Sequence, residues 1–119
     1  MIKESKKGLG NTLRAAGLGE QHLRSAKHRQ SLRAIRDLAP GEPGLRAVYL
    51  FGSILRPGHF GQRSDVDVAV DCDDPAAESR FWRALEDVLD MPVDVRPLAG
   101  TVARVVKLDG ERVYARKIS

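Results

Sequence analysis

Two aspartates spaced two residues apart, Asp65 and Asp67, are the residues of this sequence best suited to chemistry. They lie in the run SDVDVAVDC, where valines alternate with acidic or small residues, a pattern typical of a strand with one buried face. On such a strand both carboxylates emerge from the same face, with their Cα atoms about 7 Å apart. A cation between them relieves their repulsion, and Mg²⁺ binds carboxylates together with nucleotide phosphates. The pair therefore indicates a metal site, although a solvated strand edge can carry the same pattern.

A glycine–serine pair upstream offers the elements of a phosphate-binding turn. Gly52 and Ser53 follow the apolar segment LRAVYLF, which we expect to form a buried strand over residues 45–51. Glycine allows a phosphate to approach the backbone closely, and serine adds a hydroxyl and an N–H donor. Arg56 stands three residues later and can contact a phosphate, before a loop rich in Gly and Arg leads to Ser64.

A third carboxylate lies on another expected strand. An Asp-Pro pair predicts the start of a helix over residues 75–89, and the segment VDVR predicts a short strand over residues 93–96. If this strand lies beside that of the two aspartates, Asp94 joins them. Arg96 then shares the face of Asp94 and is expected to neutralise it.

The other segments predict the elements that hold this site. A basic amphipathic helix is expected over residues 21–39 and a helix over 98–106. A turn with Asp-Gly is expected over residues 107–112, followed by a closing strand over 113–115. Residues 1–20 contain four glycines and no sustained apolar stripe, so we expect an irregular or weakly helical basic arm. The fold class is therefore α+β, a small mixed β-sheet flanked by helices. We divide the chain into an N-terminal arm (1–20) and a single domain (21–119).

Length and composition narrow the class of protein. A chain of 119 residues with 42% hydrophobic and 30% charged residues fits one soluble domain, and no apolar run is long enough to span a membrane. No apolar segment follows the N-terminal lysines and there is one cysteine, so we expect a cytoplasmic protein. The net charge of +4 and the basic arm leave nucleic-acid binding open as a less favoured possibility.

Taken together, the motifs resemble the nucleotidyltransferase superfamily of DNA polymerase β, and within it the minimal nucleotidyltransferases, or MNT proteins. The resemblance covers about residues 45–114 and includes the tail ARVVKLDGERVYAR. The residues that carry it are Gly52, Ser53, Arg56, Ser64, Asp65, Asp67 and Asp94.

This resemblance implies a polymerase β-like fold and an enzyme that moves AMP, or another nucleoside monophosphate, from a nucleoside triphosphate to a hydroxyl. It implies that Gly52, Ser53, Arg56 and Ser64 bind the nucleotide, with ATP as the substrate. Asp65, Asp67 and Asp94 would be the catalytic residues and would hold Mg²⁺. Minimal members are commonly antitoxins that modify a tyrosine of a HEPN-domain ribonuclease toxin, so such a toxin is the expected partner.

Two other functions remain open at this stage. The same fold could neutralise a toxin by contact, or bind RNA through its basic arm, with catalysis weak or lost. Transfer to a small molecule such as an aminoglycoside is less favoured, because little chain remains to build a pocket for it.

Overall fold

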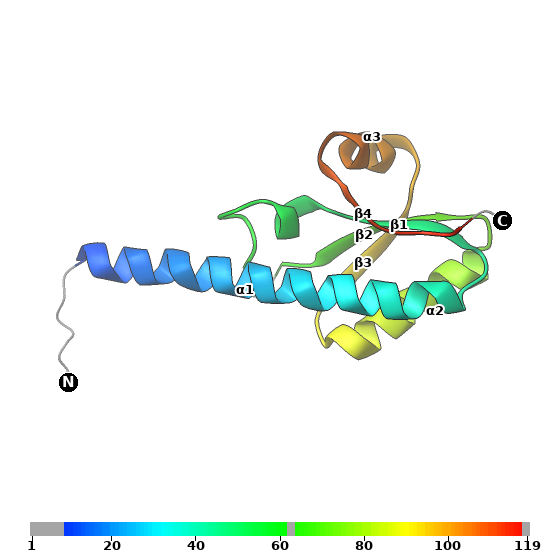
Figure 1. Cartoon of the computed structure of the whole chain (residues 1–119). Coiled ribbons are helices and arrows are strands. Elements are labelled where there is room, and N and C mark those ends of the chain that lie inside the picture. Colours follow the sequence, from blue (N-terminus) through cyan, green and yellow to red (C-terminus); the bar gives the residue numbers. More distant parts are fainter. Residues whose placement is uncertain (1–8, 62–63, 118–119) are drawn as a thin grey trace.

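A four-stranded sheet forms the centre of the computed structural model, which describes residues 9–61 and 64–117, with side chains from residue 19 onward. The strand order is β3-β2-β1-β4; β1 is antiparallel to β2 and β4, whereas β2 and β3 are parallel. Helices α1 and α2 lie on one face of the sheet and α3 on the other (Figure 1). The elements are α1 (Leu9–Leu38), β1 (Leu45–Phe51), β2 (Val66–Cys72), α2 (Pro75–Leu89), β3 (Val93–Pro97), α3 (Gly100–Asp109) and β4 (Glu111–Ala115). This arrangement confirms the predicted α+β class.

Helix α2 makes the parallel pairing of β2 and β3 possible, because parallel neighbours need a crossover connection. Its start agrees with the prediction: Asp74 Oδ1 accepts a hydrogen bond from Ala76 N at 3.0 Å, and Pro75 occupies the first helical turn. Asp90, in the left-handed region at φ 50°, ends the helix. The indole Nε1 of Trp82 donates to Val93 O at 2.7 Å and so ties α2 to the first residue of β3.

The core lies between the sheet and the pair α1 and α2. Val66, Val68 and Val70 of β2 are buried there, as the alternating pattern predicts, against apolar side chains that include Ile35 of α1 and Phe81 of α2. Ala69 points to the opposite face yet is also fully buried. Since α3 packs over β1 and β2 on that side, only the end of the face that carries the carboxylates remains open.

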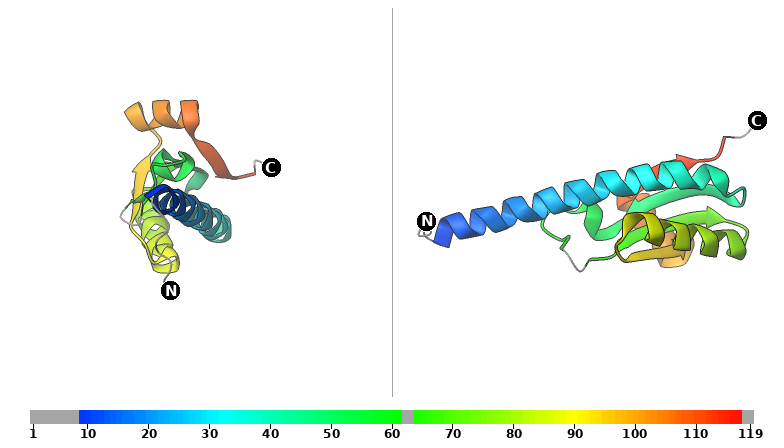
Figure 2. Two further views of the ribbon diagram at one scale, coloured as in Figure 1. Left: turned by 90° about the vertical axis from the view of Figure 1, so that its left-hand side faces the viewer. Right: turned by 90° about the horizontal axis from the view of Figure 1, so that it is seen from below.

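Helix α1 is longer than the sequence predicts. It begins at Leu9 and crosses the expected boundary at residue 20 without a break, so of the two alternatives predicted for residues 1–20, irregular or weakly helical, the structure has a helix from Leu9 onward. Glycines at 10, 17 and 19 lower helix propensity, but each added residue extends a helix that is already nucleated by its packed half. The N-terminal half projects beyond the sheet (Figure 2). Residues 1–8 lie outside the described residues, and the division into arm and domain stays a prediction.

The C-terminal elements are also shifted from their predicted bounds. Helix α3 begins at Gly100, where φ is +56°, and continues to Asp109, through residues that the sequence predicts as a turn. Strand β4 then starts directly at Glu111. None of the helices in the described part of the chain is both long and apolar enough to cross a membrane.

Candidate functional site

The parallel register of β2 and β3 brings two of the predicted carboxylates side by side. Asp67 is the direct partner of Asp94, and neighbouring strands lie about 4.8 Å apart. Asp65 stands one residue before β2 and is exposed, whereas Asp67 and Asp94 are partly buried. The structure therefore places Asp94 beside Asp67, whereas Asp65 lies just outside the strand on which it was expected.

Burial and the neighbouring charges shift the pKa of the Asp67 carboxyl. Burial raises the pKa of the Asp67 carboxyl above its usual value, and the negative charges of Asp94 and Asp65 raise it further. The guanidinium of Arg96 acts in the opposite direction. Asp67 is thus a carboxylate whose ionised form is destabilised by its surroundings, which is the electrostatic condition that a bound cation relieves.

The turn after β1 is built against the Asp67 carboxylate. Phe51, the last residue of β1, is the register partner of Asp67, and Gly52 follows it with φ +81°. A Cβ atom on Gly52 would lie 2.3 Å from Asp67 Oδ2. Glycine is therefore required twice at this position, by its backbone conformation and by the oxygen that rests against it.

Ser53 lies within the single turn of 3₁₀-helix that Gly52 opens (Gly52–Leu55), so it faces the same end of the sheet as Asp67. Arg56 follows this turn and is half exposed, and its Nη2 lies 3.8 Å from Asp109 Oδ2 at the end of α3. Ser64 differs from these two residues because its hydroxyl accepts a hydrogen bond from Gly61 N at 2.9 Å. This hydrogen bond closes the loop that leads into the acidic strand.

Arg96 neutralises Asp94, as the sequence predicts. Its Nε donates to Asp94 Oδ2 at 2.7 Å, and the Arg96 side chain is 58% exposed. The contact raises the pKa of the Arg96 guanidinium. One oxygen of the third carboxylate is therefore held by a protein cation.

The donor set fits a magnesium ion, although its geometry is not preassembled. In the described part of the chain, no three His, Cys, Asp or Glu side chains are already grouped as metal ligands. The three carboxylates nonetheless supply the hard oxygen ligands that Mg²⁺ requires, and Asp67 carries charge that the protein leaves largely unbalanced. While Oδ2 of Asp94 accepts from Arg96, Asp94 can coordinate through Oδ1, and it can use both oxygens only if Oδ2 turns away from Arg96.

Two contacts of the site were not predicted from the sequence. The approach of Asp67 to Gly52 depends on the β1–β2 register, which no motif specifies. The ion pair of Arg56 with Asp109 depends on α3 running back toward the turn, whereas the sequence predicts that α3 ends before residue 109. The Asp-Gly step at residues 109–110 was visible in the sequence but indicated only a turn.

Comparison with known protein families gives one match. Residues 33–118 match the model of the polymerase beta nucleotidyltransferase family. This range includes all four strands, α2, α3 and every predicted site residue. A comparison with curated proteins gave no significant match.

Solved structures of toxin–antitoxin complexes are similar to this chain. One is a toxin–antitoxin with AMP-PNP, 30% identical, with 72% of this chain and 74% of that chain covered and a TM-score of 0.60. Another is an MntA–HpeT mutant in which two aspartates, spaced two residues apart, are replaced by glutamate; it is 28% identical, with 73% and 74% covered and a TM-score of 0.58. A third is a tri-AMPylated Shewanella oneidensis HEPN toxin in complex with MNT antitoxin, 28% identical, with 76% and 73% covered and a TM-score of 0.53.

Proposed function

This chain belongs to the polymerase beta nucleotidyltransferase family, and we propose that it transfers AMP from ATP to a hydroxyl of a HEPN-domain toxin, most simply a tyrosine, and thereby acts as an antitoxin. The observation that carries the proposal is the register of Asp67 with Asp94, beside a glycine turn that abuts Asp67. The similar complexes with AMP-PNP and with an AMPylated toxin support the choice of nucleotide and of partner.

In this proposal Gly52 and Ser53 bind the β- and γ-phosphates through backbone N–H groups and the serine hydroxyl. Arg56, half exposed next to the turn, contacts the same phosphates when it leaves Asp109. Ser64 binds nucleotide only through the hydroxyl hydrogen that its contact with Gly61 N leaves free.

The three carboxylates hold the magnesium and orient the reaction. Asp65 and Asp67 would bind Mg²⁺, and Asp94 would complete the site. When bound, Mg²⁺ neutralises charge on the phosphates and on the departing pyrophosphate. Asp94 accepts the proton of the acceptor hydroxyl while the hydroxyl oxygen forms a bond to the α-phosphorus of ATP. The bond between the α-phosphorus and the oxygen that bridges to the β-phosphorus breaks, and pyrophosphate leaves with the electron pair.

Label transfer from ATP to the toxin tests this function. The purified chain is incubated with ATP labelled in the α-phosphate, Mg²⁺ and a HEPN-domain toxin. We expect label on the toxin, and a loss of at least about a hundredfold in rate with Asp65→Asn and Asp67→Asn combined, because both magnesium ligands lose their charge.

Asp71→Asn is the matched control, since Asp71 lies on the same strand and its carboxylate pairs with Arg46 instead of the site. This variant is expected to keep the wild-type rate. Transfer that survives the double substitution would contradict the proposed metal role.

The pairing of Asp94 with Arg96 favours one second candidate, a protein that neutralises the toxin by binding alone. Under this reading the wild-type chain binds the toxin tightly, transfers no label at any Mg²⁺ concentration, and is unaffected by the double substitution.

A further inference from the structure

The carboxylate site opens on the side of the sheet that carries α3. Asp67 alternates with the buried valines that face α1 and α2, so its side chain lies on the opposite face. Asp94, its register partner, faces the same way. If the proposed function holds, on which this inference rests, a protein acceptor must bring its hydroxyl to Asp94 from the α3 side.

Helix α3 presents an unusual surface on that side. Val106 is buried against the sheet, whereas Thr101, Arg104 and Leu108, at spacings of three and four, are exposed on the opposite side of the helix. Leu108 is 81% exposed, which makes it the more exposed of the two large hydrophobic side chains that stand out from the described surface. A leucine so exposed on a short helix is a typical anchor for a partner.

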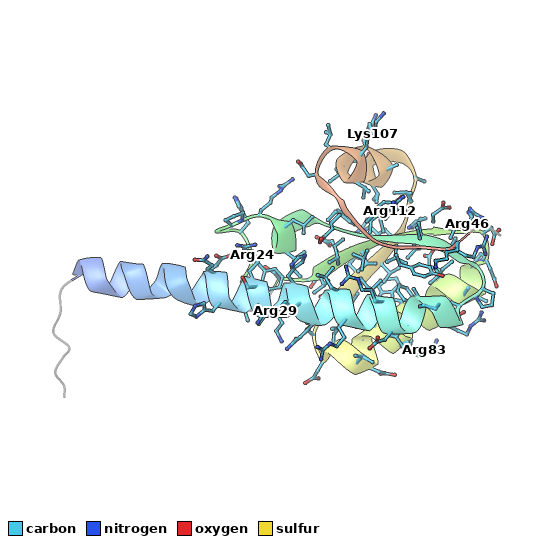
Figure 3. The ribbon with its side chains drawn as sticks, viewed as in Figure 1. Arg24, Arg29, Arg46, Arg83, Lys107 and Arg112 are labelled. Carbon is cyan, nitrogen blue, oxygen red and sulfur yellow. The ribbon has the colours of Figure 1, made fainter. Side chains whose placement is uncertain are left out.

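Exposed basic residues lie close to this leucine in the sequence. Arg104 and Lys107 are exposed on α3, and Arg112 is exposed on the neighbouring strand β4 (Figure 3). Asp109, the last residue of α3, is within ion-pair distance of Arg56. The C-terminal end of α3, which includes Leu108, therefore lies next to the Gly52–Ser53 turn, so the surface is continuous with the site.

We propose that the outer face of α3, formed by Arg104, Lys107 and Leu108, is the surface on which the acceptor protein docks, through an acidic patch that surrounds an apolar socket for Leu108. The basic side chains require an acidic surface on the partner, and the leucine lies at the centre of the contact. Docking here places the partner beside Asp94 and the phosphate turn.

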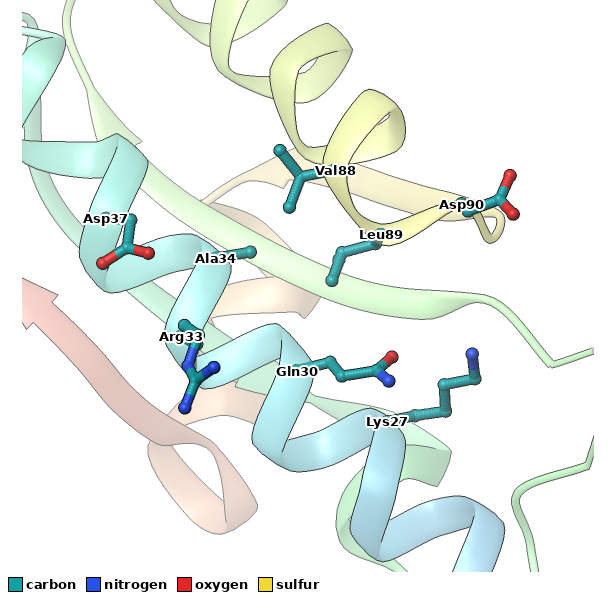
Figure 4. A pocket seen from close by; sticks show the side chains of 8 residues that line it. All are labelled: Lys27, Gln30, Arg33, Ala34, Asp37, Val88, Leu89 and Asp90. Atoms are coloured by element: carbon teal, nitrogen blue, oxygen red, sulfur yellow. The ribbon is translucent and has the colours of Figure 1, made fainter.

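The other exposed apolar side chain belongs to a different face. Val88 is 58% exposed and lines a groove of about 440 Å³ between α1 and α2, together with Lys27 and Arg33 (Figure 4). This groove also carries basic side chains, balanced by Asp37 and Asp90, and it lies across the sheet from α3. A protein bound there could not present a hydroxyl to Asp94, and the groove therefore supplies matched controls.

The experiment compares equivalent substitutions on the two faces. Leu108→Ser and Lys107→Glu change the outer face of α3, and Val88→Ser and Arg33→Glu change the groove by the same chemistry. Affinity for the HEPN toxin is measured by calorimetry, and AMP transfer is measured at several toxin concentrations. We expect each α3 variant to weaken toxin binding at least about tenfold and to raise the KM for toxin, with both groove variants unchanged.

Nucleotide binding separates this inference from the proposed function. The rise in melting temperature on addition of Mg²⁺ and ATP should be the same in all four variants and in the wild type, since none of the substituted residues belongs to the proposed nucleotide site. If the wild-type chain transfers no AMP, the proposed function fails. If it transfers AMP and the α3 variants keep its affinity and KM, or if the groove variants lose them instead, the docking surface is wrong. Loss of single-stranded RNA binding in Lys107→Glu, with toxin binding intact, would also overturn it.

Discussion

At the residue scale, the pair Asp94 and Arg96 bears most directly on the proposed magnesium site. The three carboxylates repel one another at Asp67, and Arg96 is the cation that the chain itself places among them. This pairing balances charge in the absence of metal, but it also occupies the Oδ2 oxygen of Asp94. Magnesium and Arg96 are therefore expected to compete for one carboxylate.

Arg96→Gln tests this competition. We expect the Mg²⁺ concentration for half-maximal binding, in the presence of ATP, to fall several-fold, because no protein cation then opposes the metal. Calorimetric titration with Mg²⁺ measures the effect without relying on turnover. Arg80→Gln is the control, since Arg80 pairs with Glu42 away from the site. A higher Mg²⁺ requirement in Arg96→Gln would instead mean that Arg96 holds Asp94 in the binding conformation.

At this scale the sequence predicts which residues meet but not which atoms touch. The alternation in β2 and the third aspartate after an intervening helix were enough to bring Asp67 and Asp94 together. The contact of Asp67 Oδ2 with Gly52 and the hydrogen bond from Gly61 to Ser64 were not predicted, because they depend on backbone dihedrals and strand register that motif spacing does not encode.

The turn after β1 connects the proposed phosphate site to the sheet. Two glycines that follow β1, Gly52 and Gly58, can be compared. Gly52 and Gly58 have nearly equal positive φ angles, +81° and +83°. A Cβ on Gly58 would meet nothing within 4 Å, whereas one on Gly52 would collide with the Asp67 carboxylate. Alanine substitutions at these two glycines therefore separate the destabilisation caused by backbone strain from that caused by the collision with Asp67.

Gly58→Ala is expected to lower the free energy of unfolding by about 1 kcal/mol, from the left-handed backbone alone. Gly52→Ala is expected to lower it by about 2 to 4 kcal/mol, because Asp67 must also move. Urea denaturation gives both values, and loss of the stabilisation by Mg²⁺ and ATP should accompany only Gly52→Ala. Equal effects of the two substitutions would show that the approach of Asp67 to Gly52 is unimportant.

The helices with the strongest local sequence signals were predicted most accurately. The bounds of α2 agree with the sequence because an N-cap aspartate, a proline and an apolar stripe all indicate the same helix. Helix α1 extends beyond its predicted start because its glycines lower helix propensity by only about 1 kcal/mol each, and α3 extends beyond its predicted end at residue 106 because the glycine that ends it is Gly110.

The whole molecule consists of a compact sheet domain and a helix that extends beyond it. Its principal dimensions are 60 × 28 × 23 Å, and the long dimension follows α1. The described side-chain contacts between α1 and the rest of the chain begin near Glu20, whose Oε2 accepts from Phe60 N, and continue with Leu23 against the core.

Because the N-terminal half of α1 projects beyond the sheet, deletion of residues 1–18 is expected to change the free energy of unfolding by less than about 1 kcal/mol. Ile35→Ala, at a fully buried position of the same helix, is the contrasting control and should cost about 2 to 5 kcal/mol. Thermal and urea denaturation measure both. A deletion that unfolds the protein would show that the predicted arm is an integral part of the domain.

At the scale of the whole molecule, the sequence predicted a sheet flanked by helices but not which strands each helix covers. The number of strands follows from alternation and turn residues, whereas their order in the sheet, β3-β2-β1-β4, was not predicted. That α3 covers the outer face of β1 and β2, and so confines the site to one end of that face, is a tertiary arrangement that local patterns cannot express.

The parallel pairing of β2 with β3 also has a consequence for the order of folding. β1 and β2 can pair as soon as both have been synthesised, and they then contain the glycine turn, Asp65 and Asp67. Asp94 arrives only after α2 has formed and crossed over the sheet, a long-range step that is slow relative to local pairing. During refolding, completion of the carboxylate site should lag behind formation of the β1–β2 pair, and under the proposed function a partly synthesised or partly unfolded chain would lack the residue that accepts the proton.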